Sequence, residues 1–182
     1  MQNIDNALNK NLDHQCQIED QKIISLNKFL ILSFITFGIY QVWWMFKTWR
    51  FFIQKDKVNV MPAVRAVFSI FFGYTLFERI KNYAKSEGYT QNYSSAWMFA
   101  GYVIFSLLSL FPDPYKVLSI FYILFTIPAF KALNFAKRQS KQFVVIEQKK
   151  FSTAQMIVIV IFSIFWILIL LALILFFIER LQ

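Results

Sequence analysis

The sequence is poor in the residues that most often carry chemistry or covalent cross-links. It has one histidine, one cysteine, four glycines and four prolines in 182 residues. A single cysteine, Cys16, excludes an intrachain disulfide, and Cys16 with His14 makes an incomplete metal motif, because structural zinc normally needs four ligands. The sequence also lacks a glycine-rich phosphate loop, a nucleophile elbow and a carboxylate pair. We therefore predict no catalytic, cofactor-binding or metal-binding residue, and expect that the protein is not an enzyme.

Charge is missing from several long stretches of the chain. Apolar residues make up 58% of the sequence, and phenylalanine alone contributes 23 residues, which a soluble fold of this length would have difficulty burying. The composition predicts an all-α, polytopic helical membrane protein with four transmembrane helices and one or two cytoplasmic interfacial amphipathic helices. The expected spans cover residues 29–46, 96–111, 115–133 and 156–178.

These spans are expected to form a single helical membrane domain over residues 27–182. Residues 1–26 are polar and lack the apolar core and cleavage site of a signal peptide, so we expect a flexible tail there. Pro62 is expected to begin a further helix over residues 62–81, whose uncharged core, residues 66–77, is only 12 residues long. That length favours a helix lying in the cytoplasmic interface, while a re-entrant or spanning helix stays an alternative.

Positive charge is concentrated between the apolar stretches. The net charge is +9, with eight basic residues in segment 47–95 and six in segment 131–155. Because lysine and arginine are enriched in cytoplasmic loops, we place both segments in the cytoplasm and both termini outside, in a bacterial inner (plasma) membrane. The dispersed charge does not form the continuous basic face of a nucleic-acid-binding protein, so no nucleic-acid partner is expected.

Two helix starts have local signals. Ser152 followed by Gln155 is typical of a capping box, and Ser94 or Ser95 is suited to cap the helix that follows. Lys116 and Lys131, near the two ends of span 115–133, are the charged residues within the expected spans, and the lack of charge at mid-membrane depth argues against a proton- or ion-coupled pump.

The run LSFITFGIYQVWWMFKTWRFF, residues 32–52, resembles the first helix of small uncharacterised bacterial multi-pass inner-membrane proteins of the domain-of-unknown-function kind. The residues that carry the resemblance are Ser33, Thr36, Gly38, Tyr40 and Trp43. The resemblance implies membrane architecture and no reaction. Helix packing is the common role for such small and hydroxyl residues, and the step from Thr36 to Gly38 is interpreted as a break or kink beside a shared pocket.

The lipid bilayer is the expected partner, and two hypotheses for function follow. In the first, the basic loops bind anionic lipid headgroups, another membrane protein or a second copy of the chain, through Arg50, Arg65, Lys137, Arg138 and Lys141. For Arg65 the more common role is an anchor whose side chain reaches the interface. The alternative is a small oligomeric transporter or channel, whose solute path would include hydroxyls such as those of Thr36, Ser106 and Ser119.

Overall fold

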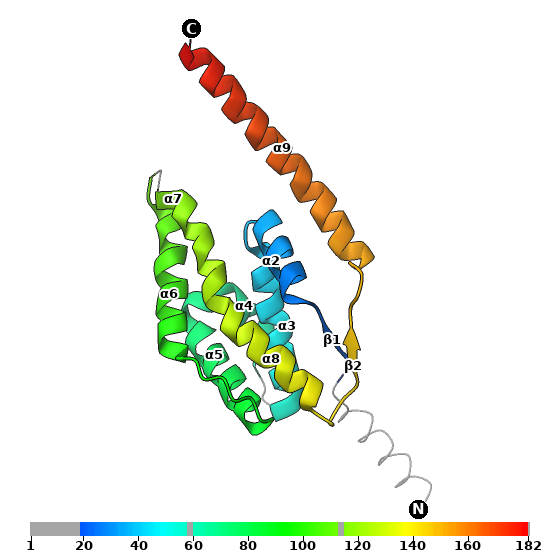
Figure 1. The fold of residues 1–182 in the computed structure, drawn as a ribbon. Coiled ribbons are helices and arrows are strands. Elements are labelled where there is room, and N and C mark those ends of the chain that lie inside the picture. Colours follow the sequence, from blue (N-terminus) through cyan, green and yellow to red (C-terminus); the bar gives the residue numbers. More distant parts are fainter. Residues whose placement is uncertain (1–18, 58–59, 113–114, 182) are drawn as a thin grey trace, which may run out of the picture.

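The structure, a computed structural model, describes residues 19–57, 60–112 and 115–181. These residues are mostly helical, which confirms the all-α prediction. Two helical hairpins lie side by side, and a long carboxy-terminal helix diverges from them (Figure 1). The motif of His14 and Cys16 lies outside the described residues.

The first hairpin consists of α2 (Leu26–Ile35) and α3 (Ile39–Asp56). Phe37 and Gly38 between them have φ angles of 50° and 87°. The rings of Phe29 and Trp44 are 5.5 Å apart, whereas a continuous helix, which rises 1.5 Å per residue, would separate these residues by about 22 Å. The expected single span over residues 29–46 is therefore wrong: the apolar stretch folds back on itself (Figure 1).

The reversal is stabilised locally and by a distant tyrosine. The Thr36 hydroxyl donates to the Leu32 carbonyl at 2.7 Å and accepts the Tyr40 N–H at 3.0 Å, so one side chain closes α2 and begins α3. Gly38 has the left-handed conformation that glycine tolerates best. A Cβ on Gly38 would lie 1.4 Å from the Tyr122 hydroxyl. The predicted break is thus confirmed, and Gly38 packs against protein.

The second hairpin rises through α6 and returns through α8. Its elements are α6 (Ser95–Leu107), the 3-10 turn η1 (Leu108–Leu110), α7 (Tyr115–Leu118), the 3-10 helix η2 (Ser119–Thr126) and α8 (Ile127–Gln139). The Trp97 N–H donates to the Ser94 hydroxyl at 3.4 Å, which confirms Ser94 as the cap of α6. Within the described residues, two stretches are long and apolar enough to cross a membrane, Ser119–Gln139 and Thr153–Phe176.

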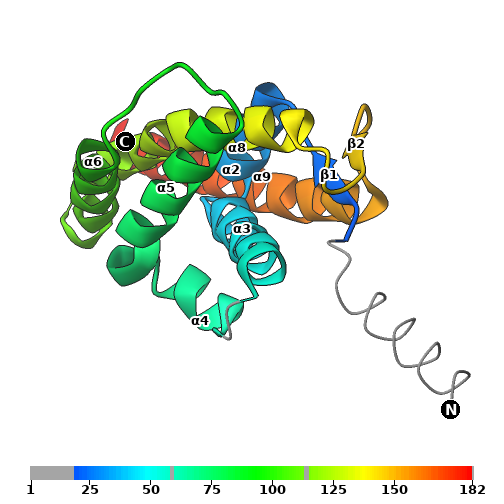
Figure 2. The same ribbon diagram turned by 90° about the horizontal axis from the view of Figure 1, so that it is seen from below.

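The helix expected over residues 62–81 is two helices, α4 (Pro62–Val67) and α5 (Ser69–Ser86). They meet at Phe68, whose ψ of 43° interrupts the helix. α4 packs against α3, and α5 packs against α6 and α8. Figure 2 shows α4 and α5 on one side of α3, and β1 with the start of α9 on the other.

Two short strands join distant parts of the chain. β1 (Gln21–Ile23) pairs in parallel with β2 (Val145–Glu147). This ladder corrects two expectations. Residues 21–26 are not part of a flexible tail. The segment that precedes α2 also lies next to the basic segment 131–155, whereas the expected topology placed the two on opposite sides of the membrane.

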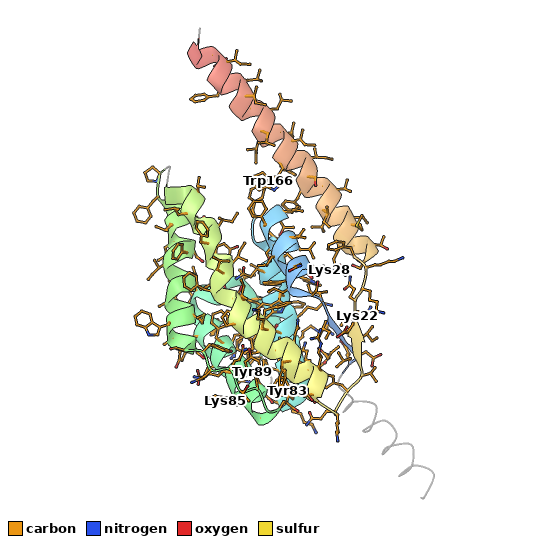
Figure 3. The ribbon with its side chains drawn as sticks, viewed as in Figure 1. Lys22, Lys28, Tyr83, Lys85, Tyr89 and Trp166 are labelled. Carbon is orange, nitrogen blue, oxygen red and sulfur yellow. The ribbon has the colours of Figure 1, made fainter. Side chains whose placement is uncertain are left out.

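The last helix, α9 (Thr153–Leu181), has 29 residues. The predicted capping box is confirmed, because the Ser152 N–H donates to Gln155 Oε1 at 2.9 Å and the Gln155 N–H donates to the Ser152 hydroxyl at 3.3 Å. α9 packs against α2, and Trp166 Nε1 donates to the Ile35 carbonyl at 3.0 Å (Figure 3). Of the residues in the apolar stretch Thr153–Phe176 whose exposure the structure describes, none is buried.

Candidate ligand cavity

A cavity of about 730 Å³ lies between β1, α3, the end of α8 and the start of α9. Three contacts hold these elements around it. Asn134 on α8 donates to the Ile24 carbonyl at 3.0 Å, which fixes the chain after β1. Gln155 Nε2 on α9 donates to the Tyr40 hydroxyl at 3.0 Å, which fixes the start of α9 beside α3. Lys28 donates to the carbonyls of residues 148 and 149, on the connection that leads to α9 (Figure 3).

One end of the cavity is basic. Arg50 is held by Glu19, with nitrogen to oxygen distances of 2.8 and 3.0 Å. Lys47 is exposed and lies over the Trp43 ring, 5.4 Å from its centroid. Glu19 and Asp20 also line the cavity, so its basic residues are only partly neutralised.

Lys137 is the buried cation of this end. Its side chain lines the cavity with 7% of the residue exposed. The ammonium donates to Gln21 Oε1 at 2.9 Å and lies 4.5 Å from the centroid of the Phe51 ring. Among the residues that the structure describes, no carboxylate forms an ion pair with it.

The other end of the cavity is aromatic and aliphatic. Trp44 and Phe130 form a buried wall, and their ring centroids are 5.8 Å apart. Ile39, Trp43 and Val158 also line the cavity, and Ile39 and Trp43 are 59% and 49% exposed. Because exposed lining residues mark an opening, the apolar end opens between α3 and α9.

The cavity brings together half of the residues proposed from the sequence. Thr36, Tyr40, Trp43, Arg50 and Lys137 all line it. The interpretation of residues 36–38 as a break beside a shared pocket agrees with this arrangement.

The other proposed residues lie elsewhere. Ser33 is fully buried in α2, and its hydroxyl has no hydrogen-bond partner among the described residues. Gly38 faces Tyr122. Arg65 lies over the Trp49 ring, with 4.7 Å between the guanidinium carbon and the ring centroid, so it packs on protein aromatics rather than simply reaching solvent.

The two remaining basic residues are at the end of α8. Arg138 pairs with Glu147 of β2 at 2.9 Å, and Lys141 is exposed. Neither lines the cavity, so both belong to the outer surface of the basic end.

Sequence reasoning missed three contributors to the cavity. In the sequence, Lys47 is simply the first residue after the expected span 29–46. Gln155 has the pattern of a capping residue, and the structure shows that its amide also reaches Tyr40. Gln21, the partner of Lys137, lies in a strand too short to give an alternating pattern. No local signal in the sequence identifies it.

The described residues contain no group of three or more side chains suited to hold a metal ion. Comparisons with protein-family models, curated proteins and solved structures find no match to the chain. The resemblance of residues 32–52 to uncharacterised bacterial membrane proteins therefore stays a prediction.

Proposed function

We propose that this chain is a non-enzymatic, multi-pass protein of the bacterial inner (plasma) membrane, which binds lipids or membrane partners at its basic end. The observation that carries the proposal is the surface of α9. No residue of its stretch Thr153–Phe176 with a described exposure is buried, and the large aliphatic and aromatic side chains of the stretch form an apolar surface. Water would solvate such a surface poorly, whereas the hydrocarbon of a bilayer matches it.

The elements suggest how the chain lies in the bilayer. We assign three crossings, through α6, through η2 with α8, and through α9. The hairpin of α2 and α3 then enters from the basic side and returns to it, which replaces the fourth crossing expected from hydropathy. Val67, Phe68 and Phe71 are exposed on α4 and α5, and they favour an interfacial position for these two helices.

Orientation follows from where the basic residues gather. The end of the molecule formed by β1, β2 and the last turns of α3 and α8 carries residues such as Lys22, Lys55, Lys137 and Arg138. The positive-inside rule places this end in the cytoplasm. The carboxyl terminus of α9 then lies outside, while the strand β1 lies inside.

Cysteine labelling tests this topology. In a Cys16→Ser background, single cysteines replace Lys22, Gln91 or Glu179, and intact spheroplasts are treated with a membrane-impermeant maleimide. We expect labelling only at position 179 until the membrane is opened, because the other two positions are on the basic side. Labelling of position 22 from outside, with position 91 protected, would contradict the proposed hairpin.

Two of the hydroxyls named for the transport alternative, those of Thr36 and Ser106, are bonded within their own helices. The Thr36 hydroxyl donates to the Leu32 carbonyl, and the Ser106 hydroxyl donates to the Tyr102 carbonyl at 2.6 Å. Both hydroxyls donate to carbonyls of their own helices, which leaves neither proton for a solute. We therefore favour binding at the basic end over transport.

A further inference from the structure

We propose that the cavity beside Lys137 binds an anionic membrane lipid, with the lipid phosphate at the basic end and the acyl chains leaving between α3 and α9. This inference rests on the proposed membrane location and names the ligand and the site. It differs from general attraction to the basic surface, because it assigns the contact to one buried lysine.

The first argument is the environment of Lys137. A buried ammonium loses its hydration, and lysine is almost never fully buried unless it is paired. Here the ammonium has a neutral amide oxygen, that of Gln21, and the face of Phe51. Neither supplies a full negative charge. An anion in the adjoining cavity would supply it.

The second argument is the division of the lining into two ends. Lys47, Arg50 and Lys137 line the basic end, and Ile39, Trp43 and Val158 line the apolar end. A small inorganic anion would use only the basic end. An anionic amphiphile matches both, because its headgroup and its chains require opposite surroundings.

The third argument is size and access. A volume of about 730 Å³ lies within the range of pockets that bind small molecules, roughly 300–1,000 Å³. It suits a headgroup and the first part of the acyl chains, while the rest of the chains extend through the opening. The exposed side chains at that opening, Ile39 and Trp43, are apolar, so the opening faces the hydrocarbon in the proposed topology.

The experiment measures lipid binding to the full-length protein in a mild detergent. Phosphatidylglycerol and phosphatidylcholine with identical acyl chains are titrated separately, and inorganic phosphate is a third ligand. Binding is followed by thermal stabilisation and by native mass spectrometry. The variants are Lys137→Met, which removes the buried charge at similar length, and Lys141→Met, which makes the same change at an exposed site outside the cavity.

We expect phosphatidylglycerol to stabilise the unmodified protein more than phosphatidylcholine does. Lys137→Met should weaken phosphatidylglycerol binding roughly tenfold, the value of one charge-assisted hydrogen bond, while Lys141→Met leaves it unchanged. If Lys137→Met does not fold, Lys47→Met at the edge of the cavity gives the second measurement, with an expected loss of several-fold.

Three results would overturn the inference. Equal losses in Lys137→Met and Lys141→Met would show general surface attraction, and would leave the proposed function standing. Full stabilisation by inorganic phosphate alone would assign the site to a free anion. Absence of any difference between the two lipids would remove the lipid site, whereas failure of the membrane location itself would appear in the cysteine-labelling experiment.

Discussion

Replacement of Gly38 by alanine tests the reversal between α2 and α3. Two costs arise at this position. The φ angle of 87° is unfavourable for a residue with a Cβ, at about 1–2 kcal/mol. The new methyl group would also lie 1.4 Å from the Tyr122 hydroxyl, and such overpacking typically costs about 1–3 kcal/mol. We therefore expect Gly38→Ala to lower the free energy of unfolding by about 2–5 kcal/mol.

Gly88 provides a matched control within the same chain. Its φ angle is 88°, and a Cβ there would meet no atom within 4 Å. Gly88→Ala should therefore show the backbone cost alone, about 1–2 kcal/mol. The difference between the losses of unfolding free energy in the two variants measures the cost of the contact with Tyr122.

A double variant separates the two costs at Gly38 further. Tyr122→Phe removes the hydroxyl but leaves the ring carbon Cζ, which would be 2.8 Å from the new methyl group. We expect Gly38→Ala to be less destabilising in the Tyr122→Phe background than in the unmodified protein, and the rescue to be partial. Unfolding is measured in detergent by circular dichroism. If Gly38→Ala costs no more than Gly88→Ala, the packing of the reversal against η2 is refuted.

Two further predictions concern single side chains. Gln155→Leu should lower the free energy of unfolding by about 1–2 kcal/mol, because the Ser152 N–H and the Tyr40 hydroxyl both lose their partner; equal denaturation midpoints for the two proteins would contradict this. Burial, and then the charges of Glu78 and Tyr89, raise the pKa of Tyr93 above its ordinary value of 10.0. The stability that the neutral phenol contributes should be fully present below about pH 10 and lost as pH rises through the raised pKa. A spectrophotometric alkaline titration should show one late-ionising tyrosine fewer in Tyr93→Phe than in the unmodified protein.

Helix starts were predictable because their signals are local. The cap at Ser94, the capping box that begins α9 and the proline that begins α4 each depend on residues within one turn of the helix. The same holds for the break at Thr36–Gly38, since the threonine hydroxyl and the glycine act within their own segment. The class of structure followed from these signals and from composition.

The direction of the chain after that break was not predictable. A continuous span and two arms that fold back have the same hydropathy, because hydropathy records composition and not direction. The choice depends on contacts with residues far along the chain, such as Tyr122 against Gly38 and Phe130 against Phe29, whose ring centroids are 4.3 Å apart. In the proposed topology the hairpin of α2 and α3 does not cross the membrane, so β1 is assigned to the cytoplasmic side instead of the outer side.

The burial of Lys137 was not predictable from the sequence for a related reason. In the sequence it is one of six basic residues in segment 131–155, and nothing distinguishes it from Arg138 or Lys141. Its burial depends on β1, which is held near the end of α8 by its pairing with β2 and by the hydrogen bond from Asn134 to the Ile24 carbonyl. The sequence therefore indicates a basic region but does not separate the buried cation from the exposed ones.

The cavity and the membrane location are physically linked through α9. Gln155 and Val158, on the first turns of that helix, form one wall of the cavity, while the rest of the helix contacts α2 and otherwise exposes apolar side chains. In the proposed membrane location, hydrocarbon around those side chains would favour the position in which α9 lies against α2 at Trp166. In the proposed membrane location, the bilayer would therefore stabilise the wall that closes the cavity, and a lipid bound in the cavity would contact the same helix from the protein side.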